Sequence, residues 1–158
     1  MAVYLAALLI GVVAGLRTFT APAAVSWAAY VGHLPLQGSW VALLGAAAAP
    51  YILTLLAAIE LVFDQLPGTP SRKSPTGFIA RLVSGAISGA AIGFAGDTWI
   101  GGLVLGIVGA VIGTFGGCAV RMRLAGIFGR DRTAAIIEDI VAVGGATLIV
   151  AFAWHLRS

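Results

Sequence analysis

The stretch GGLVLGIVGAVIGTFGGCAV, residues 101–120, contains no Asp, Glu, Lys or Arg. A helix that spans a membrane needs roughly 20 consecutive, mostly apolar residues, so this stretch alone is long enough to cross a bilayer. The whole chain has the same character, because hydrophobic residues make up 60% of its 158 residues and charged residues only 9%. Soluble domains have about 25% charged residues. The composition therefore predicts a single transmembrane domain over residues 1–158, with the lipid bilayer as its main partner.

Further apolar segments lie on both sides of this stretch. With the central segment included, the sequence predicts spans at about 2–31, 40–63, 77–95, 99–120 and 133–154. We therefore expect an all-α fold, a polytopic membrane helix bundle of about five transmembrane helices. Ser74 and Pro75 are typical of an N-cap and a first helical residue, so they predict the start of the third span. The first segment is too long for one straight span, and we expect a break in it between Gly15 and Pro22.

The basic residues predict an orientation in the membrane. Seven of the nine flank the second and fourth predicted loops: Arg72, Lys73, Arg81, Arg121, Arg123, Arg130 and Arg132. The first and third loops have none, and cytoplasmic loops of membrane proteins are enriched in Lys and Arg. This pattern favours a bacterial inner (cytoplasmic) membrane protein with a cytoplasmic N-terminus and an external C-terminus. Because the bases gather in loops and not along one polar face, no nucleic-acid partner is expected.

Glycines recur along two of the predicted spans at helical spacing. They are Gly85, Gly89 and Gly93 in the third span, and Gly102, Gly106, Gly109, Gly113 and Gly117 in the fourth. Glycine faces let helix backbones approach closely in lipid, where apolar burial no longer drives association. The spacing is that of a glycine zipper and predicts tight packing, within the bundle or between copies in a homo-oligomer. A glycine-lined pore is the alternative.

A few ionisable and hydroxyl side chains fall inside the predicted spans, where each is expensive and is a candidate functional group. The candidate substrate-binding residues are Arg17, Thr18, Thr20, Glu60, Asp64, Glu138 and Asp139. In one interpretation, the helix break exposes Arg17, Thr18 and Thr20 to Glu60 and Glu138 across a small polar cavity. In the other, Arg17 only neutralises Glu60 or Glu138, Asp64 lies at the interface, and Asp139 pairs with loop arginines.

A second candidate site is the loop before the third span. Ser71, Arg72, Lys73 and Arg81 combine a hydroxyl with positive charge near a helix N-terminus, a pattern that can bind phosphate or a lipid headgroup. Ordinary positive-inside composition also explains it. The chain lacks the sequence motifs of hydrolases, nucleotide-binding proteins and zinc enzymes, and Cys118 is its single cysteine. We therefore expect neither an enzyme nor a cofactor or metal site.

Three segments resemble an uncharacterised bacterial family of integral membrane proteins, a domain of unknown function. They are residues 15–22 (GLRTFTAP), 67–72 (PGTPSR) and 132–139 (RTAAIIED). The resemblance covers most of the chain and implies membrane residence, but it assigns no activity and no site residue. Faint similarity between the two halves leaves open an inverted repeat, as in many transporters.

The leading hypothesis from the sequence is a small permease or channel-like protein for a small polar solute or ion. The alternatives are a non-transporting membrane scaffold or accessory subunit, in which the glycine faces bind a partner helix, and a protein that handles lipid headgroups.

Overall fold

The computed structural model describes residues 1–64, 74–128 and 131–155, in which all regular elements are helical. In order, they are α1 (Ala2–Leu16), α2 (Thr20–Tyr30), the short 3₁₀ helix η1 (Ala42–Gly45), α3 (Ala49–Phe63), α4 (Pro75–Phe94), α5 (Trp99–Phe128) and α6 (Asp131–His155). The prediction of an all-α fold is confirmed for these residues. Three segments, Pro75–Phe94, Trp99–Ile127 and Thr133–His155, are long and apolar enough to cross a membrane, which indicates a membrane protein.

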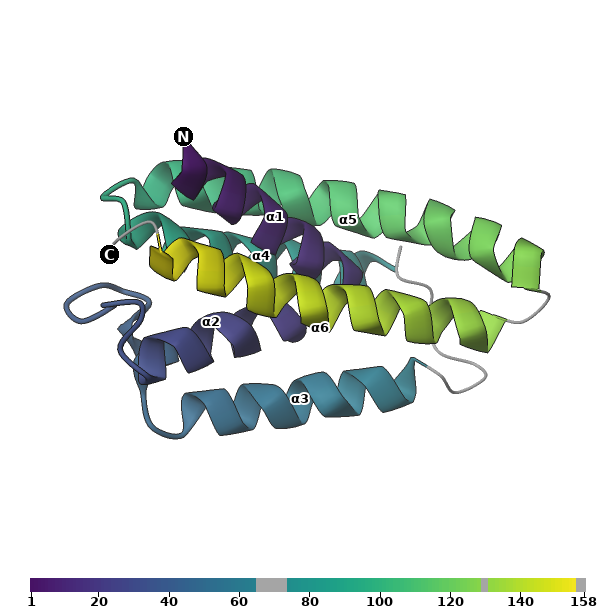
Figure 1. The fold of residues 1–158 in the computed structure, drawn as a ribbon, viewed down its shortest axis with the longest axis horizontal. Helices are drawn as coiled ribbons and strands as arrows, with labels where there is room; N and C mark the ends of the chain where they lie inside the picture. Colours follow the sequence, from purple (N-terminus) through teal and green to yellow (C-terminus); the bar gives the residue numbers. More distant parts are fainter. Residues whose placement is uncertain (65–73, 129–130, 156–158) are drawn as a thin grey trace.

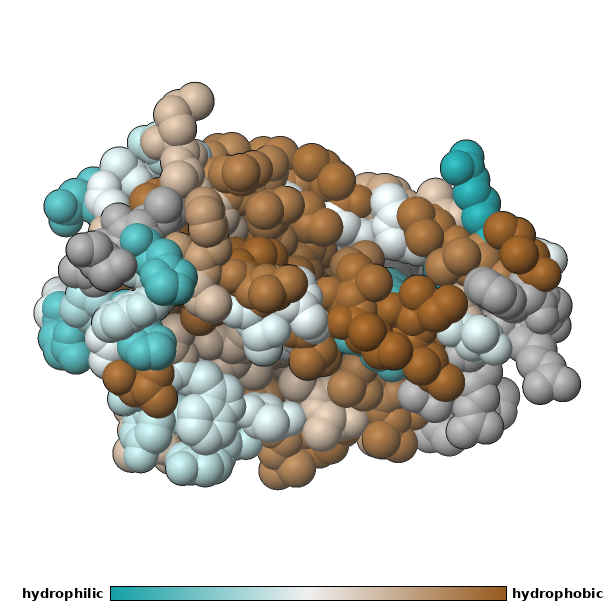
Figure 2. Space-filling view, in the orientation of Figure 1, coloured by the Kyte–Doolittle hydropathy of each residue, from teal (hydrophilic) through white to brown (hydrophobic). Residues whose placement is uncertain are grey.

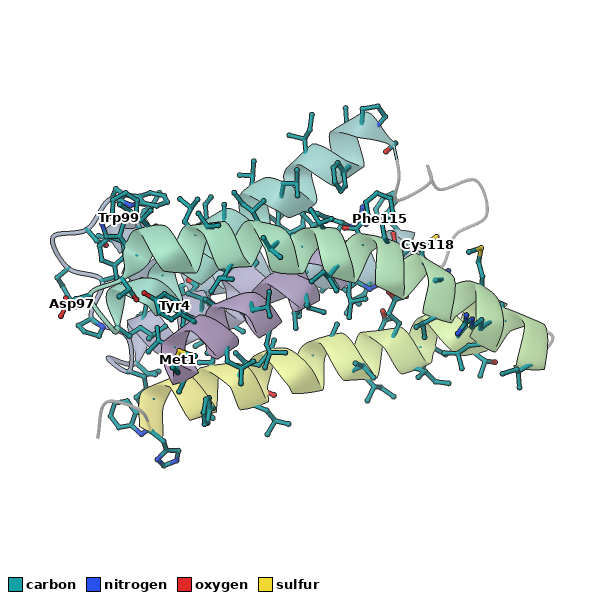
Figure 3. The ribbon with its side chains drawn as sticks, turned by 90° about the horizontal axis from the view of Figure 1, so that it is seen from above. Met1, Tyr4, Asp97, Trp99, Phe115 and Cys118 are labelled. Carbon is teal, nitrogen blue, oxygen red and sulfur yellow. The ribbon has the colours of Figure 1, made fainter. Side chains whose placement is uncertain are left out.

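The first apolar segment is broken within the expected range, since α1 ends at Leu16 and α2 begins at Thr20. Both ends of this segment lie at the same end of the bundle. Met1 and Tyr4 lie at the same end of the bundle as Asp97 of the α4–α5 turn and Trp99, the first residue of α5 (Figure 3). The ring of His33, just after α2, lies 4.1 Å from that of Trp154 near the end of α6.

The helices α1 and α2 therefore form a hairpin whose tip, residues 17–19, points into the bundle. Figure 1 places the N- and C-termini at one end of the molecule. From the sequence, this segment was expected to run on in one direction through the break, whereas α2 runs back beside the bundle. A sequence pattern detects the break in the helix, but it does not say that the chain turns back there.

Two predicted boundaries also differ from the structure. The second segment becomes α-helical only at Ala49, with Pro50 in the first turn of α3, where a missing N–H costs nothing. The helix α5 continues past Val120 to Phe128, so Arg121 and Arg123 lie on a helix and not in a loop. The predicted start of α4 is confirmed, because the backbone N–H of Gly77 donates to the Oγ of Ser74 at 3.4 Å.

The helices α1, α4 and α5 pack with their backbones almost in contact. A Cβ atom added at Gly11 would lie 2.3 Å from the backbone oxygen of Gly106, and one added at Gly89 would lie 2.3 Å from that of Gly102. Contacts this short leave no room for even a methyl group. We call these three helices the tight half of the bundle.

The helices α2, α3 and α6 form a second, more open half. Pro50 is the one buried residue of α3, a helix that the structure describes in full and that packs mainly on α2. Several of its large apolar side chains, among them Ile52, Leu55 and Val62, are more than half exposed. In Figure 2 apolar side chains cover the middle of the visible face, and hydrophilic ones gather mainly towards its ends. This distribution suits a surface surrounded by lipid.

Candidate functional site at the α1–α2 tip

The tip of the α1–α2 hairpin leaves the helical hydrogen-bond pattern, and a carboxylate satisfies its free N–H groups. Arg17 has an extended backbone (φ −139°, ψ 118°), although its N–H still donates to the carbonyl of Val13 at 2.8 Å. The next two N–H groups, of Thr18 and Phe19, donate to the two carboxylate oxygens of Glu60 at 2.7 and 2.9 Å. Hydrogen bonds to an ionised acceptor are about twice as strong as neutral ones. Glu60 therefore fixes the tip to α3.

Two hydroxyl groups lie beside the carbonyls on either side of Arg17. Ser84 of α4 donates to the carbonyl of Thr18. The Thr114 hydroxyl of α5 lies 2.8 Å from the carbonyl of Ala110 in its own helix and 3.3 Å from that of Gly15. Sequence reasoning did not select either residue. The one sequence feature that they share is a neighbouring glycine, since Ser84 precedes Gly85 and Thr114 follows Gly113.

The side chain of Arg17 is fully buried and forms ion pairs with two aspartates from different helices. Its Nη1 pairs with Asp64, at the end of α3, and its Nη2 pairs with Asp139 of α6. The two aspartate side chains are each 14% exposed, whereas that of Arg17 is 0% exposed. We call Arg17, Asp64 and Asp139 the charged triad. It joins three segments far apart in the sequence.

The triad corrects the expected pairing of the charges. Within the residues that the structure describes, neither Glu60 nor Glu138 is an ion-pair partner of Arg17, because Glu60 binds the tip backbone and Glu138 lies 3.9 Å from Arg121 of α5. Asp64 and Asp139 both pair with Arg17, whereas one interpretation of the sequence paired Asp139 with loop arginines. The sequence predicted a helix break and buried charges in this region, but it did not predict which charges pair with each other.

A groove runs between α2, α3 and α6. Its inner part, of about 260 Å³, is lined mainly by alanines and by Thr20, Trp27, Thr54, Leu61, Val143 and Thr147. An outer part, of about 350 Å³, shares Trp27 and Thr147 with it and reaches His33 and Trp154. The groove therefore extends to the end of the bundle at which α6 ends. Trp27, Thr54 and Thr147 were not selected from the sequence.

The charged triad lies one helical turn beyond the inner end of this groove. Leu61 of α3 lines the groove and Asp64 follows three residues later, while Val143 of α6 lines it and Asp139 precedes it by four. Residues three or four apart lie on the same face of a helix. Thr20 is the first residue of α2, three residues after Arg17. The triad thus lies next to the groove, on the same faces of α3 and α6.

The hydroxyls in the groove differ in their bonding. Trp27 donates through its indole N–H to Thr54 at 2.9 Å, and the Thr147 hydroxyl lies 2.8 Å from the carbonyl of Gly144 in its own helix. The hydroxyl of Thr20, a residue only 6% exposed, has no hydrogen-bond partner in the described part of the chain. A buried polar group without a partner is unusual and calls for an explanation.

The predicted headgroup site is only partly visible. Ser71, Arg72 and Lys73 lie outside the described residues. Arg81 is described, and it is buried on α4, with its Nη1 3.5 Å from the carbonyl of Gly77. Its role as a headgroup ligand stays a prediction. Among the described residues no cluster of three His, Cys, Asp or Glu side chains is arranged to hold a metal ion.

Comparison with protein-family models, curated proteins and solved structures finds no match to this chain. The resemblance of residues 15–22, 67–72 and 132–139 to a bacterial membrane family therefore stays a prediction. The function has to be argued from the geometry of the tip, the triad and the groove.

Proposed function

We propose that this chain is a small permease or channel-like protein of a bacterial inner membrane, for a small polar solute or ion. One observation carries the proposal: a groove leads from one end of the bundle towards a non-helical tip that is fixed by charged side chains. Non-helical backbone at membrane depth is tolerated only where protein buries it or where it lines a water-filled cavity. In transporters, broken helices of this kind build the binding site.

In the proposed membrane arrangement, the α1–α2 hairpin enters from one side and returns, while α3, α4, α5 and α6 cross. The sequence predicted about five crossing helices, whereas in this arrangement four helices cross and the hairpin does not. Among the crossing helices, α3 is short: its 15 residues rise about 22 Å, so the helix alone does not cover the roughly 30 Å of a bilayer core. Arg121 and Arg123 lie near the end of α5 that is far from the termini, so the positive-inside rule places both termini outside.

The rival proposal is a non-transporting scaffold or accessory subunit. The complete burial of Arg17 and its pairing with two carboxylates favour it, because paired charges in a dry site need no solute. In this reading the exposed apolar faces, that of α3 above all, contact a second copy of the chain or a partner helix. The groove is the feature that the rival does not explain.

Stopped-flow light scattering of reconstituted vesicles tests the proposal. Vesicles with the full chain are shrunk osmotically in urea, glycerol, potassium chloride or an alkylammonium chloride, and entry of the solute makes them swell again. We expect faster re-swelling than in protein-free vesicles for at least one solute. Ala24→Phe, which fills both parts of the groove, abolishes the difference.

The matched control is Leu148→Phe, which enlarges an exposed side chain of α6 that does not line the groove. It keeps the transport rate of the wild type. If folded, inserted wild-type protein speeds the entry of none of these solutes, the scaffold proposal replaces transport.

A further inference from the structure

A second groove lies on the other side of α6, between α5, α6 and the end of α1, and we call it the lateral groove. We propose that it binds one phospholipid, with an acyl chain along the glycines of α5 and the phosphate group beside Arg123. The inference goes beyond the proposed function and does not depend on transport. It joins three observations: the early end of α1, the narrow apolar space that this end leaves, and the exposed arginine at one end of that space.

The lateral groove exists because α1 is too short to cross the bundle. The helix α1 lies between α5 and α6 in the half of the molecule that holds Met1 and Tyr4 (Figure 3). Its 15 residues rise about 22 Å, and it ends at Leu16, where the hairpin turns back. A space of about 280 Å³ remains beside α5 and α6, with Val12 and Leu16 in its wall. In a bilayer, the molecules available to fill such a space are lipids.

The lining of the lateral groove is apolar apart from Arg121 and Glu138. Three glycines, 113, 116 and 117, form part of its α5 wall, and the other lining residues are valine, leucine, isoleucine and alanine. A Cβ atom added at Gly116 would meet nothing within 4 Å, so the space above this glycine is open. Hydrocarbon is therefore the chemistry that fits these walls.

The dimensions of the lateral groove suit an acyl chain better than a partner helix. On α5 its lining runs from Ile112 to Leu124, which is about 18 Å, close to half of a bilayer core of roughly 30 Å. Its volume spread over this length leaves a mean cross-section of about 16 Å², whereas an α-helix with its side chains is about 10 Å across. The space thus has the length of one leaflet and the width of a chain.

The charged end of the lateral groove places the phosphate. Arg121 and Glu138 lie 3.9 Å apart in its wall, with side chains only 17% and 8% exposed. Arg123 is exposed, and it follows Gly116 by seven residues and Val120 by three, so it lies on the same face of α5. Arginine binds phosphate through two parallel hydrogen bonds. Basic pockets between membrane helices on the cytoplasmic side bind lipid headgroups in this way.

Native mass spectrometry of the purified full chain in detergent tests the inference. The probes are dipalmitoyl phosphatidylglycerol, dipalmitoylglycerol, which has the same chains without the phosphate, and dihexanoyl phosphatidylglycerol, which has the phosphate on short chains. We expect one bound dipalmitoyl phosphatidylglycerol per chain. The other two probes bind at least about tenfold more weakly, because each lacks one of the two contacts.

Two variants separate the acyl contact from the phosphate contact. Gly116→Leu lowers the affinity for both dipalmitoyl lipids about tenfold, since the new side chain takes the place of two or more methylene groups. Arg123→Gln removes the preference for phosphatidylglycerol over dipalmitoylglycerol. The matched control is Gly126→Leu, the same change at an exposed α5 glycine that also has open space and does not line the groove; it stays within twofold of wild type.

Three results would overturn the inference: equal losses in the two glycine variants, a phosphatidylglycerol preference that survives Arg123→Gln, or a statistical series of adducts that no variant changes. A dimer that dissociates in Gly116→Leu with lipid binding unchanged would assign the lateral groove to a second copy instead. None of these results affects the transport proposal, because Ala24→Phe fills the other groove. Absence of flux with this pattern of lipid binding removes the transport proposal alone.

Discussion

The two halves of the bundle are held together by opposite means. In the tight half, α1, α4 and α5 touch through glycine backbones, so that Gly11, Gly89 and Gly106 have no space for a side chain. In the open half, α2, α3 and α6 enclose a groove, and ion pairs of Arg17 with Asp64 and Asp139 join α3 and α6. Backbone contacts define one geometry, whereas ion pairs between flexible side chains can be exchanged for a ligand. The tight half is therefore the more rigid of the two, and the proposed site lies in the open half.

The tip of the α1–α2 hairpin connects these halves. Its Thr18 carbonyl bonds to α4 through Ser84, and its N–H groups bond to Glu60 of α3. The Arg17 side chain pairs with Asp64, at the end of α3, and with Asp139 of α6. A change at the tip therefore affects both halves, and a change within one half tests that half alone.

The largest effect is expected from Arg17→Gln, which removes the charge shared by both halves. Asp64 and Asp139 would be left as partly buried carboxylates without their common partner. Removing one partner of a buried ion pair costs about 4 kcal/mol. Denaturant titration in micelles, followed by tryptophan fluorescence, measures the loss.

Arg123→Gln is the control, because Arg123 is exposed near the end of α5. We expect its stability to stay within about 0.5 kcal/mol of wild type. If the two variants lose equal stability, the triad does not join the halves.

The next largest loss of stability is expected from Gly106→Ala, which tests the tight half alone. A Cβ atom at Gly106 would lie 2.1 Å from the backbone oxygen of Gly85, which a rigid helix cannot withdraw. Overpacking of this kind costs about 3 kcal/mol. The same denaturant titration measures this loss of stability.

Gly116→Ala is the matched control in the same helix, since a Cβ atom there meets nothing within 4 Å. The better helix propensity of alanine then leaves stability equal or raises it by up to about 1 kcal/mol. A loss in Gly116→Ala as large as in Gly106→Ala would show that α5 responds to any added methyl group, and the proposed difference between the halves would fail.

Much of the fold could be predicted from the sequence, because lipid imposes strict requirements on composition. A charge-free stretch at 101–120 and the Ser74–Pro75 start signal correctly predicted helices over those residues. Chain direction at the break was not predictable. The residues from Gly15 to Pro22 interrupt a helix whether the chain continues or turns back, and only contacts at both ends, such as His33 with Trp154, decide between them.

The sequence predicted which charged residues belong to the candidate site, but it did not predict which of them pair with each other. Any charge in an apolar segment is a candidate, so Arg17, Glu60, Asp64 and Asp139 were identified from the sequence. Their partners depend on the rotation of each helix about its axis, which an almost uniformly apolar helix such as α5 or α6 does not encode. Ser84 was missed for a related reason, since a serine among small residues is also what close helix packing favours.

The smallest effect expected is that of Ser84→Ala, which tests one bond between the tip and the tight half. The Ser84 hydroxyl donates to the carbonyl of Thr18, and losing such a bond costs about 1 kcal/mol. Ser88→Ala, one turn later on α4, removes a fully buried hydroxyl that has no partner in the described part of the chain. That change is expected to be neutral or slightly stabilising, because no bond is lost.

Hydrogen exchange separates the two serines more sharply than stability does. The N–H groups of Thr18 and Phe19 bond to Glu60, and Ser84 holds the same peptide segment from the opposite side. Without Ser84 the segment opens more often, so exchange at Thr18 and Phe19 speeds up in Ser84→Ala and keeps its wild-type rate in Ser88→Ala. Equal rates in both variants would mean that Glu60 alone fixes the tip, and the tip would then belong to the open half only.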